Sequence, residues 1–214
     1  MKIIKLEKGE DQPELYRELN KTLKQGGLVC VPCNGTYRIL AALDDEEAVT
    51  RLWQSKRRVH NAPSLVFVDS KKTLYKVAAQ VGEVAKILID NFWPGPLTIL
   101  FEANPELPAG VVKQIVKANG KIGVRIPDSE VTRRVVEEFK GALLASSANK
   151  GKKHGESSPA QIRKNFIGRI DIFVDAGDLV AGVTSTVVDI VDGKAVVTRP
   201  GAIEPELLAL LHEV

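Results

Sequence analysis

The stretch STVVDIVDGKAVVTRPG, residues 185–201, constrains the fold more than any other part of the chain. Two runs rich in β-branched residues flank Asp192 and Gly193, a pattern that predicts two antiparallel strands joined by a two-residue turn. Elsewhere, single strand-like runs alternate with helical patterns, as in α/β proteins. A hairpin added to that alternation excludes a purely parallel sheet. We therefore expect an α/β (α+β) fold with a mixed parallel and antiparallel sheet.

The first segments show how the alternation is read. Residues 12–25 carry Pro13 near their start and leucines at helical spacing, and a glycine pair follows them, so we expect a helix. The run 28–32 is apolar throughout, as in a strand covered on both faces. Residues 44–58 have acids in the first turn and bases in the last, which complements the helix dipole. This helix would bring Lys56 and Arg58 to its C-terminal end.

The remaining elements follow from the same patterns. We read 33–38 as a loop where a strand reaches a ligand pocket, and 150–158 as a mobile, basic, glycine-bearing loop. Further strands are expected at 64–68, 97–103, 122–127, 142–148 and 171–177, and further helices at 71–80, 82–92, 129–139, 158–166 and 204–211.

The bulk composition narrows the class of protein. With 214 residues, of which 44% are hydrophobic, the chain can bury the core of one domain over 1–214. A formal net charge of +3 is too small for a dedicated nucleic-acid binder. Cys30 and Cys33 have no second pair or histidine cluster that would complete a zinc site, so we expect no structural metal. No apolar run approaches about 18 residues, and the opening turns charged too soon for a signal peptide. We expect a cytoplasmic protein without a membrane segment.

Cationic and short polar side chains gather where the expected elements end. In open α/β sheets, ligands bind at such strand ends. Each residue alone has a plain alternative, such as a solvated helix end, a cap or a turn. Together they indicate an anion, because a polyphosphate needs cations and small donors that approach its oxygens. The residues are Lys56, Arg58, Arg125, Ser146, Ser147, Asn149, Thr184, Ser185, Thr186 and Arg199.

Known phosphate-binding and catalytic motifs do not explain this gathering. The sequence contains neither G-x-x-x-x-G-K-[ST] nor G-x-G-x-x-G, which excludes a P-loop and a dinucleotide fingerprint. A Ser-His-Asp arrangement is not evident either, because His60, His154 and His212 all lie in loop-like or terminal places. We assign no catalytic side chain.

Eight segments, in order and at the right spacing, resemble the YrdC family, whose best-known activity is threonylcarbamoyl-AMP synthesis for tRNA modification. They are GGLVCVP, KRR as the family's K-x-R, FWPGPLT, GVRIPDS, SSAN as its S-x-N, DAG, STVVD and TRPGAI. The resemblance implies a twisted mixed sheet flanked by helices, with an electropositive concave face. It also implies a nucleotidyltransferase that joins L-threonine, bicarbonate and ATP, with Mg²⁺ on the phosphates. The product would pass to a downstream threonylcarbamoyl transferase.

The resemblance also assigns roles by matching position. Lys56 and Arg58 would neutralise ATP phosphates, while Ser147 and Asn149 would bind the nucleotide or its metal-bound phosphates. Arg199 would support the nucleotide from the hairpin. Three further residues complete the assignment: Ala145 would contribute backbone contacts to ATP, and Arg125 and Ser185 would hold threonine, with the guanidinium on its carboxylate.

One loop departs from the family pattern P-T-D/E-T-x-Y-G-L. Pro32 and Tyr37 persist, but the pattern's threonine, acid, threonine and glycine are replaced by Cys33, Asn34, Gly35 and Arg38. Lost hydroxyls remove groups that could select a threonine side chain, and an arginine could fill the pocket or pair with an acid. Two alternatives therefore stay open: a divergent paralogue with another amino-acid or carbamoyl substrate, and a non-catalytic module that binds double-stranded RNA or tRNA.

Overall fold

The computed structural model describes residues 1–7, 9–56, 64–116, 120–150, 155–204, 206–207 and 210. In chain order the elements are β1 (Lys2–Lys5), α1 (Pro13–Lys24), β2 (Val29–Cys33), β3 (Thr36–Ala42), α2 (Glu46–Ser55), β4 (Leu65–Phe67), α3 (Lys71–Val77), α4 (Glu83–Phe92), β5 (Leu97–Glu102), α5 (Ala109–Ile115), β6 (Lys121–Arg125), α6 (Glu130–Phe139), β7 (Leu143–Ser147), α7 (Pro159–Phe166), β8 (Ile172–Asp175), β9 (Thr186–Val191) and β10 (Lys194–Arg199).

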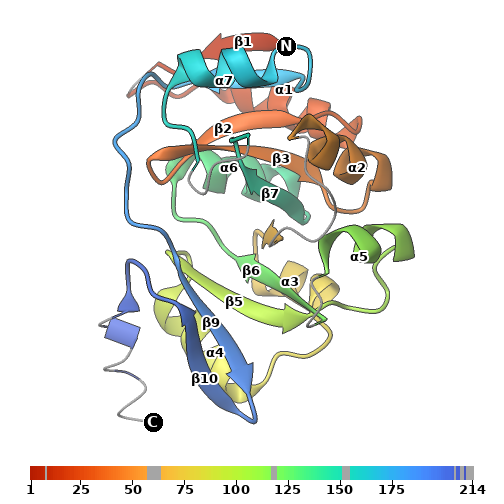
Figure 1. Cartoon of the computed structure of the whole chain (residues 1–214), viewed down its shortest axis with the longest axis vertical. Coiled ribbons are helices and arrows are strands. Elements are labelled where there is room, and N and C mark those ends of the chain that lie inside the picture. The colour runs from red at the N-terminus through yellow and green to blue at the C-terminus, as the bar shows by residue number, and fades with distance from the viewer. Residues whose placement is uncertain are drawn as a thin grey trace.

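These strands form one ten-stranded sheet in the order β1-β8-β2-β3-β7-β4-β6-β5-β9-β10 (Figure 1). Four pairs are parallel, namely β1 with β8, β2 with β8, β4 with β6 and β5 with β9. The other five pairs are antiparallel. The expected mixed sheet flanked by helices is therefore confirmed.

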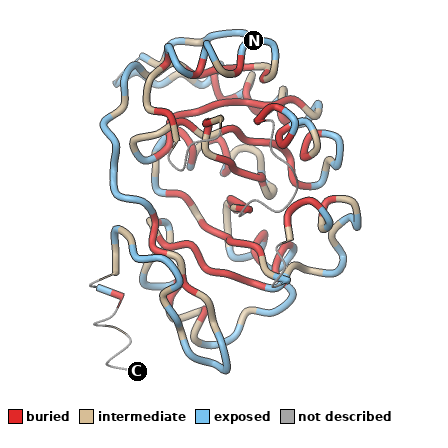
Figure 2. The backbone as a smooth tube through the Cα atoms, viewed as in Figure 1, coloured by how far each residue is buried: buried red, intermediate tan, exposed pale blue. Residues whose placement is uncertain are grey.

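Alternation along the strands separates two cores on opposite faces of the sheet. Cys30 and Leu144 point into a core built with α2, α3, α4, α5 and α7. Their neighbours Val29, Leu143 and Ala145 point into a second core built with α1 and α6. Figure 2 shows the buried strands between these helices. Among the described residues, the contacts of α1 and α6 with the sheet concentrate on β2 and β3. The second core extends to β4 through Phe67 and includes no described residue of β5, β6 or β9.

Most expected helices and strands are confirmed, including the hairpin that turns at Asp192 and Gly193. Both turn residues have positive φ, 51° and 73°, as a type I′ turn requires. The helix expected at 44–58 is shorter. It begins after Asp45, whose carboxylate accepts from the Ala48 amide over 2.9 Å, and its last turn holds no base.

Some expectations fall on residues that the structure does not describe. They include the segment 57–63, part of the loop at 150–158 and half of the residues of the expected final helix at 204–211. Two short elements, β1 and α5, were not predicted. β1 is an exposed edge strand of four residues, and α5 has seven residues with a glycine at its second position, so neither carries a clear periodic pattern.

The expectation of a loop at 33–38 is wrong. β2 and β3 form a hairpin in which Cys33 pairs with Thr36, and the turn residues Asn34 and Gly35 have φ of 47° and 75°. Asn-Gly is the strongest short hairpin signal because both positions need positive φ. The reading as a ligand loop overlooked that signal. Arg38 therefore lies inside a strand, opposite Ser147 of β7.

The segment 176–184 joins β8 to β9 and runs exposed along one side of the molecule (Figures 1 and 2). The Tyr37 hydroxyl holds its start, donating to the Gly177 carbonyl over 2.7 Å and accepting from the Ala176 amide over 3.0 Å. Further along, the segment passes over the β2–β3 turn. A Cβ on Gly35 would lie 2.2 Å from the Val180 carbonyl oxygen. This close approach requires glycine.

Candidate functional site

A cavity of about 490 Å³ opens on the face of the sheet that α1 and α6 leave uncovered. Its described lining comes from seven strands, from the end of α2 and from the segments that precede β4, follow β7 and precede β9. The lining residues are Arg38, Lys56, Ser64, Leu65, Thr98, Leu100, Gly123, Ala145, Ser146, Ser147, Asn149, Ser185, Val187, Asp189, Thr198 and Arg199.

One row of paired residues forms the floor. Leu65 of β4 pairs with Ala145 on one side and with Gly123 on the other, and Gly123 pairs with Leu100 of β5. Residues paired across a sheet share a face. The small Ala145 and Gly123 leave space above the backbone, and a Cβ on Gly123 would lie 2.9 Å from the Thr98 methyl carbon. The register therefore creates the hollow.

Lys56 stands directly after α2, and only 2% of it is exposed. Its ammonium donates to the Ser146 hydroxyl over 2.6 Å and to the Ser147 carbonyl oxygen. These bonds hold a cation at the end of β7. Asn149, which follows, is also buried and lines the cavity.

The opposite wall comes from the β9–β10 hairpin. Arg199 of β10 pairs with Val187 across a register shift, and its guanidinium donates to the Ser185 carbonyl oxygen over 2.7 Å and to the Ser185 hydroxyl over 2.9 Å. That hydroxyl also lies 3.1 Å from the hydroxyl of Thr98. Burial lowers the pKa of Arg199, and the positive charges of Arg38 and Arg125 lower it further.

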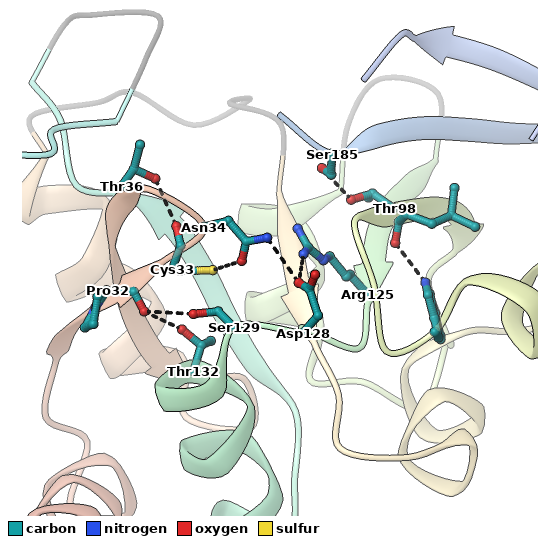
Figure 3. A network of polar contacts seen from close by, with 12 residues as sticks. Pro32, Cys33, Asn34, Thr36, Thr98, Arg125, Asp128, Ser129, Thr132 and Ser185 are labelled. Carbon is teal, nitrogen blue, oxygen red and sulfur yellow. Dashed lines mark hydrogen bonds and ion pairs between the residues drawn. The ribbon is translucent and has the colours of Figure 1, made fainter. Parts of the chain in front are cut away.

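Arg125 is buried at the end of β6 and is not among the residues that line the cavity. Its guanidinium forms an ion pair with Asp128, and the Asn34 side-chain amide donates to the same carboxylate oxygen over 3.1 Å (Figure 3). Burial lowers the pKa of Arg125, whereas Cys33 and Asp128 oppose that shift. Asp128 thus fastens the β2–β3 turn to β6.

Arg38 also lines the cavity. The expectation of a loop at 33–38 did not predict this position. The Arg38 guanidinium donates to the Ser147 hydroxyl over 3.5 Å and lies 6.0 Å from the centre of the Phe67 ring. Within the part of the chain that the structure describes, no carboxylate forms an ion pair with it. Its Nε is buried without a hydrogen-bond partner. The strand register opposite Ser147 turns this side chain to the cavity.

The cavity brings together six of the eight residues singled out for ATP and threonine, namely Lys56, Ala145, Ser147, Asn149, Ser185 and Arg199. Arg125 lies nearby on the same face of β6 as Gly123, two residues earlier. Arg58 lies outside the described residues. Three cations and one carboxylate occur in the described lining, and that carboxylate, Asp189, is 2.6 Å from the ammonium of Lys121.

The described residues contain no group of three or more histidine, cysteine, aspartate or glutamate side chains placed to hold a metal ion. None of their helices is long and apolar enough to span a membrane.

This fold and cavity match a known family. Residues 21–201 fit the family model Sua5_yciO_yrdC, described as "Telomere recombination". The chain belongs to this Sua5/YciO/YrdC family. Among its relatives is the threonylcarbamoyl-AMP synthase of Pyrococcus abyssi, 30% identical over 184 residues, which are 86% of this chain and 53% of that protein. The chain thus spans about half the length of that relative.

Two other relatives have nearly the same length as this chain. The putative threonylcarbamoyl-AMP synthase of Methanocaldococcus jannaschii is 32% identical over 210 residues, 97% of each chain. The uncharacterised protein YciO of Escherichia coli is 25% identical, over 89% of this chain and 90% of its own. Among solved structures, P. abyssi Sua5 complexed with L-threonine superposes with a TM-score of 0.86 at 27% identity, covering 99% of this chain and 61% of that one.

Proposed function

We propose that the chain is an L-threonylcarbamoyladenylate synthase that acts in tRNA modification. It would join L-threonine, bicarbonate and ATP, release pyrophosphate and pass threonylcarbamoyl-AMP to a threonylcarbamoyl transferase. The observation that carries this proposal is the convergence of Lys56, Ser147, Asn149, Ser185 and Arg199, from four distant segments, on one cavity. The family membership and the threonine complex of P. abyssi Sua5 support the same reaction.

The proposed chemistry needs positioning and charge neutralisation more than a protein nucleophile. The threonine amine and bicarbonate combine to a carbamate with loss of one water molecule, and an oxygen of this carbamate attacks the α-phosphorus of ATP. The new bond joins the carbamate oxygen to phosphorus, and the bond to the β-phosphate oxygen breaks, so pyrophosphate leaves with that electron pair. Lys56 and Arg199 would stabilise the growing negative charge from opposite walls, and Ser185 would orient the amino acid.

Magnesium fits this site only as an ion carried by the nucleotide, since the described residues offer no carboxylate cluster of their own. Mg²⁺ on the phosphates would neutralise part of their charge. Ser147 and Asn149, which supply a hydroxyl and an amide oxygen at the end of β7, are the residues that would face such an ion.

Pyrophosphate release from ATP tests the proposal. We expect release to require both L-threonine and bicarbonate, and mass spectrometry to detect threonylcarbamoyl-AMP. The absence of turnover under these conditions, together with salt-sensitive tRNA binding, would refute it in favour of a binding module.

A divergent paralogue is the second candidate, and Arg38 is the observation that favours it. This bulky cation lines the cavity where the family pattern has glycine, while Cys33 and Gly35 replace hydroxyl-bearing residues. Stimulation of pyrophosphate release by a different amino acid, and not by threonine, would select this candidate.

A further inference from the structure

Arg38 sits where it can reach an anion in the cavity. Its backbone pairs with Ser147, and its guanidinium donates to the hydroxyl of that residue. The carbonyl oxygen of Ser147 accepts from Lys56. The end of β7 therefore holds two cations, one on each side of Ser147, and both line the cavity.

Among the residues that the structure describes, no carboxylate balances the positive charge of Arg38. Among described residues Arg38 forms no ion pair, and its Nε is buried without a partner. Across the cavity, Arg199 is partly exposed and, among the described residues, its guanidinium donates to Ser185 alone. Partial burial lowers the pKa of Arg199, and the nearby charge of Arg38 lowers it further. Like charges brought together in a partly dry site repel each other, so a bound anion between them relieves both the repulsion and the unmet hydrogen-bonding capacity.

We propose that Arg38 is a polyphosphate-binding residue that works with Arg199, the two guanidinium groups holding one phosphate group of the ligand between them. The inference rests on the proposed function only in taking a polyphosphate as the ligand. Paired guanidinium groups suit this chemistry because each presents a planar fork of donors to phosphate oxygens. Arg38 and Lys56 both donate hydrogen bonds to Ser147, so two cations stand at the end of β7. This concentration of positive charge favours a phosphate over a carboxylate as the ligand.

Calorimetric titration of the full chain with inorganic pyrophosphate, without divalent cations, tests this role. Arg38→Gln should weaken pyrophosphate binding about tenfold or more, because it removes a charge-assisted hydrogen bond. Arg38→Lys, which keeps the charge and loses the fork, should retain more affinity than Arg38→Gln. Arg17→Gln, on the exposed face of α1 and paired with Glu14, is the matched control and should bind as the wild type does.

A double-mutant cycle tests whether the two arginines share one group. If they do, Arg38→Gln and Arg199→Gln together should weaken binding by less than the product of the single effects. Independent, multiplicative losses would overturn the shared group. Pyrophosphate affinity that is unchanged or higher in both Arg38 variants would also overturn the proposal. A parallel titration with L-aspartate, a dicarboxylate, serves as a comparison, and a loss of affinity for L-aspartate but not for pyrophosphate would overturn it too.

These titrations involve neither threonine nor turnover, so they separate this inference from the proposed function. Arg38-dependent pyrophosphate binding without synthase activity would support the inference while refuting the function. Threonine-dependent turnover with wild-type pyrophosphate affinity in Arg38→Gln would do the reverse.

Discussion

The ammonium of Lys56 donates a hydrogen bond to the hydroxyl of Ser146 over 2.6 Å, although only 2% of Lys56 is exposed. This bond joins the end of α2 to the end of β7, two elements about ninety residues apart in the chain. These contacts hold the Lys56 ammonium in the lining of the cavity, where a cation suits an anionic ligand.

Lys56→Met should weaken ATP binding at least tenfold, because a charge-assisted contact of this kind contributes about 1.5–3 kcal/mol. It also leaves the Ser147 carbonyl without this donor, but the variant no longer buries a charge, so the two effects on folding oppose each other. Calorimetry with ATP, combined with urea unfolding, measures both. Lys72→Met, on the exposed face of α3, is the control. Equal ATP affinities in the two variants would contradict the assignment.

Arg125→Ala should raise the KM for the amino acid about tenfold or more, with a smaller effect on ATP, since its guanidinium pairs with Asp128 after β6 whereas Lys56 is bonded at the end of β7. Arg125→Lys serves as a milder variant that keeps a charge beside Asp128. Steady-state pyrophosphate release gives both constants, and Arg133→Ala on the exposed face of α6 is the control. Similar mild effects on both substrates would discredit separate roles for Lys56 and Arg125.

Gly35→Ala should destabilise the protein more than Gly193→Ala. Both glycines lie in hairpin turns with nearly equal φ, 75° and 73°, so each alanine incurs about 1–2 kcal/mol of left-handed strain. Only Gly35 faces a close neighbour, the Val180 carbonyl, and that clash adds roughly 1–3 kcal/mol. Urea unfolding of both variants measures the difference. Equal losses would show that the segment 176–184 moves aside without cost.

Tyr37→Phe should lower the free energy of unfolding by about 1–3 kcal/mol near neutral pH, because it removes two hydrogen bonds to the segment 176–184. Burial raises the pKa of Tyr37 from 10.0 to about 12. A raised folded-state pKa means that the folded protein holds this proton more tightly. The protonated Tyr37 therefore contributes fully to the free energy of unfolding below its unfolded-state pKa of 10.0. This contribution is lost as the pH rises through its folded-state pKa of about 12.

Unfolding of wild type and Tyr37→Phe, compared at about pH 8 and about pH 11, therefore checks this shift. The stability difference between the two proteins should narrow at the higher pH, while losses common to both cancel. A difference that stays constant or widens would contradict a buried, protonated Tyr37.

Local signals account for most of the fold that could be predicted. The Asp192–Gly193 turn depends on two residues with positive φ, and the leucine spacing of α1 depends on one helix face, so both are readable from short windows. The β2–β3 hairpin was equally readable from Asn34 and Gly35, but the expectation of a ligand loop hid it. The order of strands was not readable, because pairings such as β5 with β9 join segments far apart in sequence.

The candidate site could likewise be predicted only in part from local sequence. Motif order grouped Lys56, Ser147 and Arg199, which line one cavity. Arg38 was noted as a departure, but its direction depends on the register of β3 against β7, and a shift by one residue would turn it to the opposite core. The bond of Asn34 to Asp128, which also pairs with Arg125, joins residues far apart in the sequence and needs three-dimensional proximity that no spacing rule contains.

The cavity wall formed by β10 has a consequence for biosynthesis. Lys56 emerges from the ribosome long before Arg199, yet both face the same hollow, so a nascent chain that has released β2 to β7 still lacks one side of the pocket. Ligand capture must then wait until the last hairpin has docked beside β5. A nucleotide bound in the cavity would in turn link segments of the chain that are synthesised early to segments that are synthesised late.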